Sequence, residues 1–249
     1  IEKADIAFVN LEAPVTSPQM KAVRIRKLPI LSARASLPSS LAQAGFDIVS
    51  LANNHPFDWG LAGVNATLKA VRASGLKFTG LGLDRASAQK PAILEYQGVR
   101  IGVIAVTDRV NQPPPKGSRP PFVAWLNQRR LVRQVEALRP TVDILIVSLH
   151  WGISYKETFI PSQARIARAL ARAGADLLIG HHPHVLQPVG FADKAKRVPV
   201  AYSLGNFLFG GQKGARARTI LLQVDFSVTP GKGRPQLVGI RHLPLVVTQ

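Results

Sequence analysis

Histidine, asparagine and glutamate side chains follow predicted strands at four places in this sequence. They are Glu12 after the strand candidate at 6–11, Asn53, Asn54 and His55 after 48–52, His150 after 144–149, and His181, His182 and His184 after 177–179. Five of the six histidines thus stand just past a strand. Ligands bind at the carboxyl ends of strands in open α/β sheets, so we expect these side chains to form one site.

The residue types at these strand ends indicate metal chemistry. Imidazole, carboxylate and amide groups suit zinc, manganese or iron, and the absence of cysteine excludes thiolate sites, disulfides and thiol nucleophiles. On an extended chain His182 and His184 would point to one side, where they could chelate one metal or serve two. Two metals about 3.5–4 Å apart can activate a water and hold both oxygens of a phosphoryl displacement.

Each of these residues also has an ordinary interpretation when taken alone. Glu12 can be a loop carboxylate, and Asn53-Asn54 can be a turn. Asp58, which precedes a predicted helix, can be its N-cap or can support a neighbouring ligand. His242 follows no strand end and is predicted to be a surface residue. The coincidence of four strand ends favours the site.

Strands and helices alternate along much of the chain. We predict helices at 39–44, 61–74, 127–138 and 161–173, a hairpin at 92–96 and 99–106, irregular loops at 17–35 and 111–121, and a mostly β region at 198–247. The alternation predicts a parallel sheet, and the β-rich middle and tail add antiparallel strands. A two-sheet sandwich with helices outside satisfies both patterns, and 249 residues suit one large domain.

The composition is strongly basic, with a net charge of +18. Such a chain attracts polyanions, although a merely solvated basic surface explains the charge equally well. Nucleic acid ranks last among these partners, because aromatic residues make up only 6% of the chain and no basic segment is interleaved with them. No phosphate-binding loop, dinucleotide fingerprint, nucleophile elbow or membrane-spanning apolar run is present.

The motifs around these strand ends resemble those of the CapA-like family of bacterial capsule and poly-γ-glutamate synthesis proteins. They are Asn10-Leu11-Glu12, Ala52-Asn53-Asn54-His55 with Asp58 and Gly60, His150-Trp151-Gly152, Gly174-Ala175-Asp176 with Gly180-His181-His182-Pro183-His184, and Tyr202-Ser203-Leu204-Gly205-Asn206-Phe207. The resemblance runs in order from about residue 5 to 210. Several motifs in one order are specific to this family.

This resemblance implies a four-layer α/β/β/α sandwich of the metallophosphoesterase type with a dinuclear metal site (Mn, Zn or Fe). It places Glu12, Asn54, His150, His182 and His184 as metal ligands, with Asn54 a better match than Asn53. It places His55 as the acid that protonates a leaving group or stabilises its charge. Asn53, Asp58, His181 and Asn206 are expected to support the ligands or to contact substrate.

The sequence departs from the family pattern at three points. The strand that carries a G-D motif, which supplies an aspartate ligand, would precede Ile1. We therefore expect a single domain over 1–249 that is truncated at its N-terminus and lacks its first strand. Ser154 and Gly190 stand where the family has glutamates, and both departures bear on substrate contacts.

The resemblance favours a role in synthesis of an anionic capsule polymer such as poly-γ-glutamate, together with other membrane-bound capsule synthesis proteins. It also predicts an extracytoplasmic place in the cell envelope, with a membrane anchor in a segment missing from this chain. Two alternatives stay open: a metal-dependent hydrolase of phosphate mono- or diesters, and a polyanion-binding module without catalysis. The first alternative is compatible with the capsule role.

Overall fold

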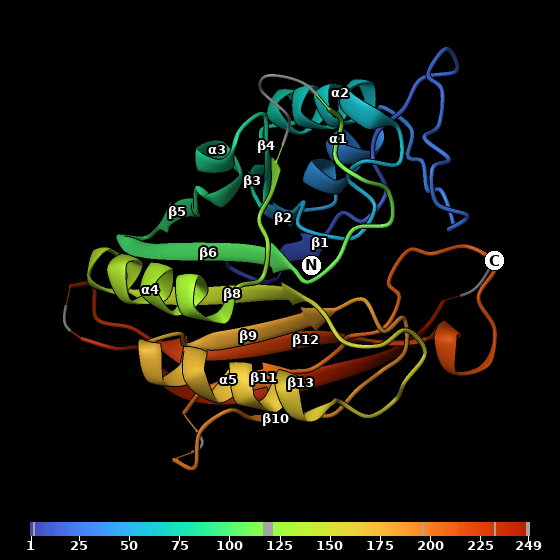
Figure 1. The fold of residues 1–249 in the computed structure, drawn as a ribbon. Coiled ribbons are helices and arrows are strands. Elements are labelled where there is room, and N and C mark those ends of the chain that lie inside the picture. The colour runs from blue at the N-terminus through green and yellow to red at the C-terminus, as the bar shows by residue number, and fades with distance from the viewer. Residues whose placement is uncertain (2, 117–121, 196, 232, 248–249) are drawn as a thin grey trace. The chain divides into compact units, whose positions relative to one another are not determined.

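A computed structural model describes residues 1, 3–116, 122–195, 197–231 and 233–247 (Figure 1). The chain divides into two compact units. Unit 1 comprises Ile1–Ile93 and Ile104–Leu126, and unit 2 comprises Leu94–Val103 and Asn127–Gln249. The hairpin of β5 (Ala92–Tyr96) and β6 (Val99–Thr107) contributes residues to both units. The single domain expected over 1–249 stays a prediction.

Unit 1 is built on a parallel sheet in the order β1 (Phe8–Asn10), β2 (Ile48–Ser50) and β3 (Lys77–Thr79). Its other elements are the helices α1 (Leu37–Gln43), α2 (Gly60–Ala73) and α3 (Arg85–Gln89), and the antiparallel pair of β4 (Leu81–Gly82) and β7 (Phe122–Val123). Strand β2 is buried along its whole length. Because β1 and β2 run parallel, the residues that follow them meet at one edge of the sheet.

Unit 2 contains a six-stranded sheet in the order β10-β11-β9-β8-β6-β5. The new strands are β8 (Ile144–His150), β9 (Leu177–His181), β10 (Val189–Phe191) and β11 (Pro199–Ala201). Strands β8, β9 and β11 are parallel, whereas β10 is antiparallel to β11. A separate antiparallel pair is formed by β12 (Arg218–Ser227) and β13 (Gln236–Val246). The parallel pairing brings the ends of β8 and β9 side by side.

The helices of unit 2 begin and end where local sequence signals indicate. Helix α4 (Gln128–Leu138) begins after Asn127, whose side chain accepts a hydrogen bond from the Arg130 amide. Helix α5 (Pro161–Ala173) begins at a proline and ends at Gly174, which is left-handed at φ 114°. Short 3₁₀ helices span Arg139–Thr141 and Gly214–Ala217. In Figure 1, α4 and α5 lie in front of the sheet of unit 2.

The predicted helices, the hairpin and the buried strands are confirmed to within a few residues. Five short elements, β3, β4, β7, β10 and α3, were not predicted, because two to five residues carry no readable periodicity. The irregular loop at 17–35 is confirmed. The loop predicted at 111–121 falls partly outside the described residues.

Asp143, just before β8, should make the stability of unit 2 depend on pH. The backbone amides of Arg100 and Gly231 each donate to its carboxylate at 2.8 Å, and these bonds lower the pKa of Asp143. A carboxyl whose pKa is depressed by folding stabilises above its unfolded pKa of about 4, and this contribution disappears as pH falls through the folded value. We expect Asp143→Asn to destabilise by about 2 kcal/mol at neutral pH.

Urea unfolding of the wild type and Asp143→Asn at neutral and at acidic pH checks this prediction. The difference in unfolding free energy should shrink as the pH is lowered. Asp5→Asn, a change at an exposed carboxylate, is the matched control and should have little effect at either pH. A difference that is the same at both pH values would contradict the prediction.

Candidate metal and catalytic site

Glu12 follows β1 at the sheet edge of unit 1, as the sequence predicts. Its Oε2 accepts a 3.5 Å hydrogen bond from Asn10 Nδ2, and its Oε1 lies 3.9 Å from Nε2 of His55. Burial raises the pKa of Glu12 to about 7, although the nearby His55 opposes this shift. A carboxylate in this position gains from any cation that replaces its lost hydration.

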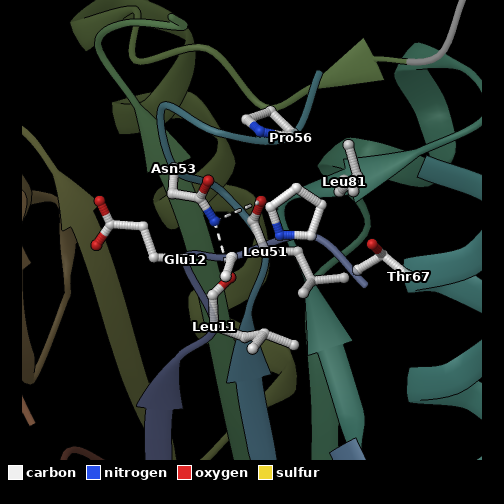
Figure 2. Close-up of a pocket in the computed structure, with 9 residues that line it drawn as sticks. Leu11, Glu12, Leu51, Asn53, Pro56, Thr67 and Leu81 are labelled. Atoms are coloured by element: carbon white, nitrogen blue, oxygen red, sulfur yellow. Dashed lines mark hydrogen bonds between the residues drawn. The ribbon is translucent and has the colours of Figure 1, made fainter. Parts of the chain in front are cut away.

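Asn53 joins the segments that follow β1 and β2. Its amide nitrogen donates to the carbonyl of Leu11 at 2.9 Å and of Leu51 at 3.5 Å (Figure 2). Its Oδ1 accepts from the His55 amide at 2.8 Å. With both ends of its amide engaged, Asn53 fixes where Glu12 and His55 stand. This geometry suits a supporting role rather than a ligand role.

The pocket beside Glu12 is too small to hold a substrate. It has a volume of about 10 Å³, enough for at most one water. In Figure 2 the Glu12 carboxylate points away from Leu81 and Thr67 on the far side of this pocket. The chemistry of Glu12 therefore lies outside the pocket.

His55 and Asp58 form a buried pair. His55 Nδ1 donates to Asp58 Oδ2 at 2.6 Å, and both side chains are almost fully buried. Asp58 is not the N-cap of α2, because that helix begins at Gly60 and its capping residue is Trp59. The cap interpretation is therefore wrong. Asp58 instead sets the ring orientation and the tautomer of His55, which leaves Nε2 to give or accept a proton.

Asn111 is part of this cluster, and sequence reasoning did not find it. Its side chain lies 3.2 Å from Nε2 of His55, and its Oδ1 accepts from Nδ2 of Asn54 at 3.1 Å. Its backbone amide also donates to the Asn54 carbonyl at 2.6 Å. The one available signal was a polar residue shortly after the long apolar strand β6. Asn111 thus fixes the orientation of the Asn54 amide.

Unit 2 brings His150, His182 and His184 together. The ring centroids of His150 and His182 are 5.0 Å apart, and those of His182 and His184 are 6.0 Å apart. The expectation of an extended His-x-His pair is wrong, because His182 and His184 have φ values of 99° and 58°. Backbone in this left-handed region is strained for residues other than glycine, and such strain gathers at functional sites.

Neighbouring polar groups orient the histidines of unit 2. His184 Nδ1 donates to Asn206 Oδ1 at 2.8 Å, so Nε2 carries the lone pair. Ser154 Oγ lies 3.1 Å from Nε2 of His182. Burial lowers the pKa of His184, although the bond to Asn206 opposes the shift, and burial lowers the pKa of His181 to about 4. Neutral imidazoles held by such partners are the form that ligates metals.

The candidate residues therefore gather in two clusters, one in each unit. Unit 1 carries Glu12, Asn53, Asn54, His55 and Asp58, and unit 2 carries His150, His181, His182, His184 and Asn206. Within the part of the chain that the structure describes, no group of three or more His, Asp or Glu side chains is placed to hold a metal. The donor types fit a borderline divalent metal, and their convergence stays a prediction. His242 is exposed on β13, as predicted.

The fold is similar to that of a solved 5′-nucleotidase precursor from Thermus thermophilus. The TM-score is 0.52 at 18% identity, over 84% of this chain and 40% of that one. This likeness confirms the predicted fold class, an α/β sandwich. The fold thus establishes the structural class of the protein.

Comparisons of sequence define the family. The family model described as "Bacterial capsule synthesis protein PGA_cap" matches residues 1–211, so the chain belongs to this family. It is 31% identical over 214 residues to the capsule biosynthesis protein CapA of Bacillus anthracis, across 84% of this chain and 51% of that protein. It is 30% identical over 240 residues to the PGA biosynthesis protein CapA of Bacillus subtilis, across 95% of this chain and 61% of that protein. The chain thus spans about half to three fifths of these relatives.

Proposed function

We propose that this chain is the metal-binding part of a protein that synthesises or handles an anionic capsule polymer, poly-γ-glutamate, in the cell envelope. Membership of the capsule synthesis family and the names of the two Bacillus relatives support this role. The net charge of +18 suits association with an acidic polymer. No described helix is long and apolar enough to cross a bilayer. Membrane-bound proteins of capsule synthesis are the proposed partners.

The observation that carries the proposal is that each unit, taken by itself, gathers donor side chains where its strands end. Glu12 and Asn54 in unit 1, with His150, His182 and His184 in unit 2, would hold two divalent ions of Mn, Zn or Fe. When bound, such ions supply a hydroxide nucleophile at neutral pH and stabilise charge on phosphoryl oxygens. The substrate class that fits this chemistry is a phosphate mono- or diester.

His55 would act as the proton donor to the leaving group. In the imidazolium form its Nδ1–H would donate to Asp58, and its Nε2–H would be the proton that is transferred. After Nε2 gives up its proton, the neutral ring keeps the bond to Asp58 at 2.6 Å and so keeps its orientation. A buried carboxylate behind the ring stabilises the charged form before transfer. The Asn111 amide beside Nε2 would position the ring or the substrate.

Metal content tests the ligand assignment directly. We expect the wild type to keep bound divalent metal after dialysis, and His150→Ala and His184→Ala to lose most of it. The histidine rings are the strongest neutral donors in the set, and removing one breaks the chelate. Elemental analysis by mass spectrometry gives the metal-to-protein ratio.

His242→Ala is the matched control, because this histidine is exposed on β13 and should leave the metal content unchanged. Circular dichroism shows whether each variant is folded before its metal is counted. Folded His150→Ala and His184→Ala proteins that both keep their metal would contradict the ligand assignment.

A further inference from the structure

An exposed basic loop extends from Lys21 to Arg34 in unit 1. No acidic residue occurs from 13 to 46. The five cations of this 21–34 loop are all exposed, and they are Lys21, Arg24, Arg26, Lys27 and Arg34. None of them forms an ion pair with another residue that the structure describes. The loop therefore presents uncompensated positive charge to solvent.

Asp58 pins both sides of the loop at its base. The Asp58 carbonyl accepts from the Val23 amide at 2.7 Å, and Oδ2 of its carboxylate accepts from the Leu31 amide at 2.8 Å. The Trp59 indole donates to the Leu31 carbonyl at 2.6 Å. The seven residues between these anchors are thus held as a defined protrusion. The same carboxylate oxygen holds the His55 ring.

Gln112 braces the tip of the loop from a second direction. This buried side chain accepts from the Arg26 amide at 3.0 Å and donates to the Arg26 carbonyl at 2.9 Å. Arg26 also donates from its guanidinium to the Val110 carbonyl at 3.1 Å. Because the backbone is tied in this way, binding through the exposed side chains on either side of Arg26 carries a lower cost of backbone ordering.

Apolar side chains stand among the cations at this tip. Ile25 is 74% exposed and Leu28 is 44% exposed, in the run Arg24-Ile25-Arg26-Lys27-Leu28. Exposed aliphatic side chains flanked by cations are typical of segments that enter the headgroup region of an anionic bilayer. We propose that the 21–34 loop docks unit 1 onto a membrane surface rich in anionic phospholipid.

The apolar tip decides between a membrane and the acidic polymer as the partner. A polycarboxylate chain in water gains from the cations but offers no apolar layer to Ile25 and Leu28. A bilayer satisfies both, with charge attraction at the headgroups and burial of the aliphatic side chains below them. Docking would hold the Asp58–His55 pair close to the membrane. This inference goes beyond the proposed function and needs neither metal nor substrate to be tested.

Sedimentation of the full chain with lipid vesicles tests the proposal. We expect binding to vesicles that contain phosphatidylglycerol and none to vesicles of phosphatidylcholine alone. Arg24→Gln with Lys27→Gln should weaken binding roughly thirtyfold, which corresponds to about 1 kcal/mol for each cation near the surface. Ile25→Ser with Leu28→Ser should weaken it about tenfold, because the apolar contribution is lost.

The matched control removes two exposed cations elsewhere, by Arg165→Gln with Arg172→Gln on α5, and should keep its vesicle binding. Retention on immobilised poly-γ-glutamate, measured on the same proteins, separates the two partners. The proposal would be overturned if the wild-type protein did not bind anionic vesicles. It would also be overturned if the α5 control variant lost as much vesicle binding as the Arg24→Gln, Lys27→Gln variant. A loop variant that loses polymer retention but keeps vesicle binding would overturn it as well.

Discussion

His55→Gln is expected to lower the hydrolysis of an alkyl phosphodiester by about 10²–10⁴-fold, the usual contribution of a positioned acid. The reason is the geometry of one ring. Asp58 holds Nδ1 at 2.6 Å, so Nε2 is the ring nitrogen that would give its proton to the leaving oxygen. Glutamine keeps part of the volume and the polarity but cannot supply a proton. Initial rates with added manganese measure the effect.

The leaving group distinguishes loss of an acid from general damage. Nitrophenolate departs without protonation, whereas an alkoxide needs a proton as it leaves. We therefore expect His55→Gln to slow an alkyl ester far more than a nitrophenyl ester. His242→Gln is the matched control and should leave both rates unchanged, because that side chain is exposed on β13. Equal losses for the two esters, with metal retained, would contradict the acid role.

Much of the framework of this site could be predicted from the sequence. Buried strands are legible as apolar runs, and β2, β8 and β9 begin at the residues the runs indicate. Helix ends can be predicted too. Helix α5 ends at Gly174 in a left-handed conformation, which glycine adopts more easily than other residues. The residues just past such strands are therefore predictable as a group from the sequence alone. Their convergence on one site stays a prediction, because it depends on tertiary structure and not on any local pattern of residues.

Other parts of the site left no pattern in the sequence. Asn111 lies in a segment with several prolines, where nothing distinguishes a residue that contacts a histidine from one that faces solvent. Asp58 stood at a position typical of a cap, but its carboxylate is turned to His55 and Leu31 instead. The positive φ values of His182 and His184 could not be predicted from the sequence either, because glycine is the residue type that indicates such a conformation. Tertiary contacts decide such details, and local propensity does not.

Gly180→Ala is expected to destabilise unit 2 by about 3 kcal/mol or more, the upper range for overpacking in a well-packed interior. Gly180 lies in β9 one residue before His181, opposite Leu149 of β8. A Cβ atom there would overlap the carbonyl oxygen of Tyr202 and stand 2.7 Å from the Trp151 indole nitrogen. Neither atom can move away at low energetic cost, because the Tyr202 oxygen is part of the backbone and the Trp151 side chain is fully buried.

The two obstacles are also bonded to each other, which is why the effect should exceed that of an ordinary glycine substitution. The Trp151 indole donates to the Tyr202 carbonyl at 3.1 Å, so a methyl group at Gly180 would push this hydrogen bond apart and leave both groups buried without it. Urea unfolding measures the loss. Gly190→Ala is the matched control within unit 2, since no atom lies within 4 Å of its added Cβ, and it should change stability by no more than about 0.5 kcal/mol. If both variants unfold at the wild-type midpoint, the close approach of the Tyr202 backbone to β9 is not what requires glycine at this position.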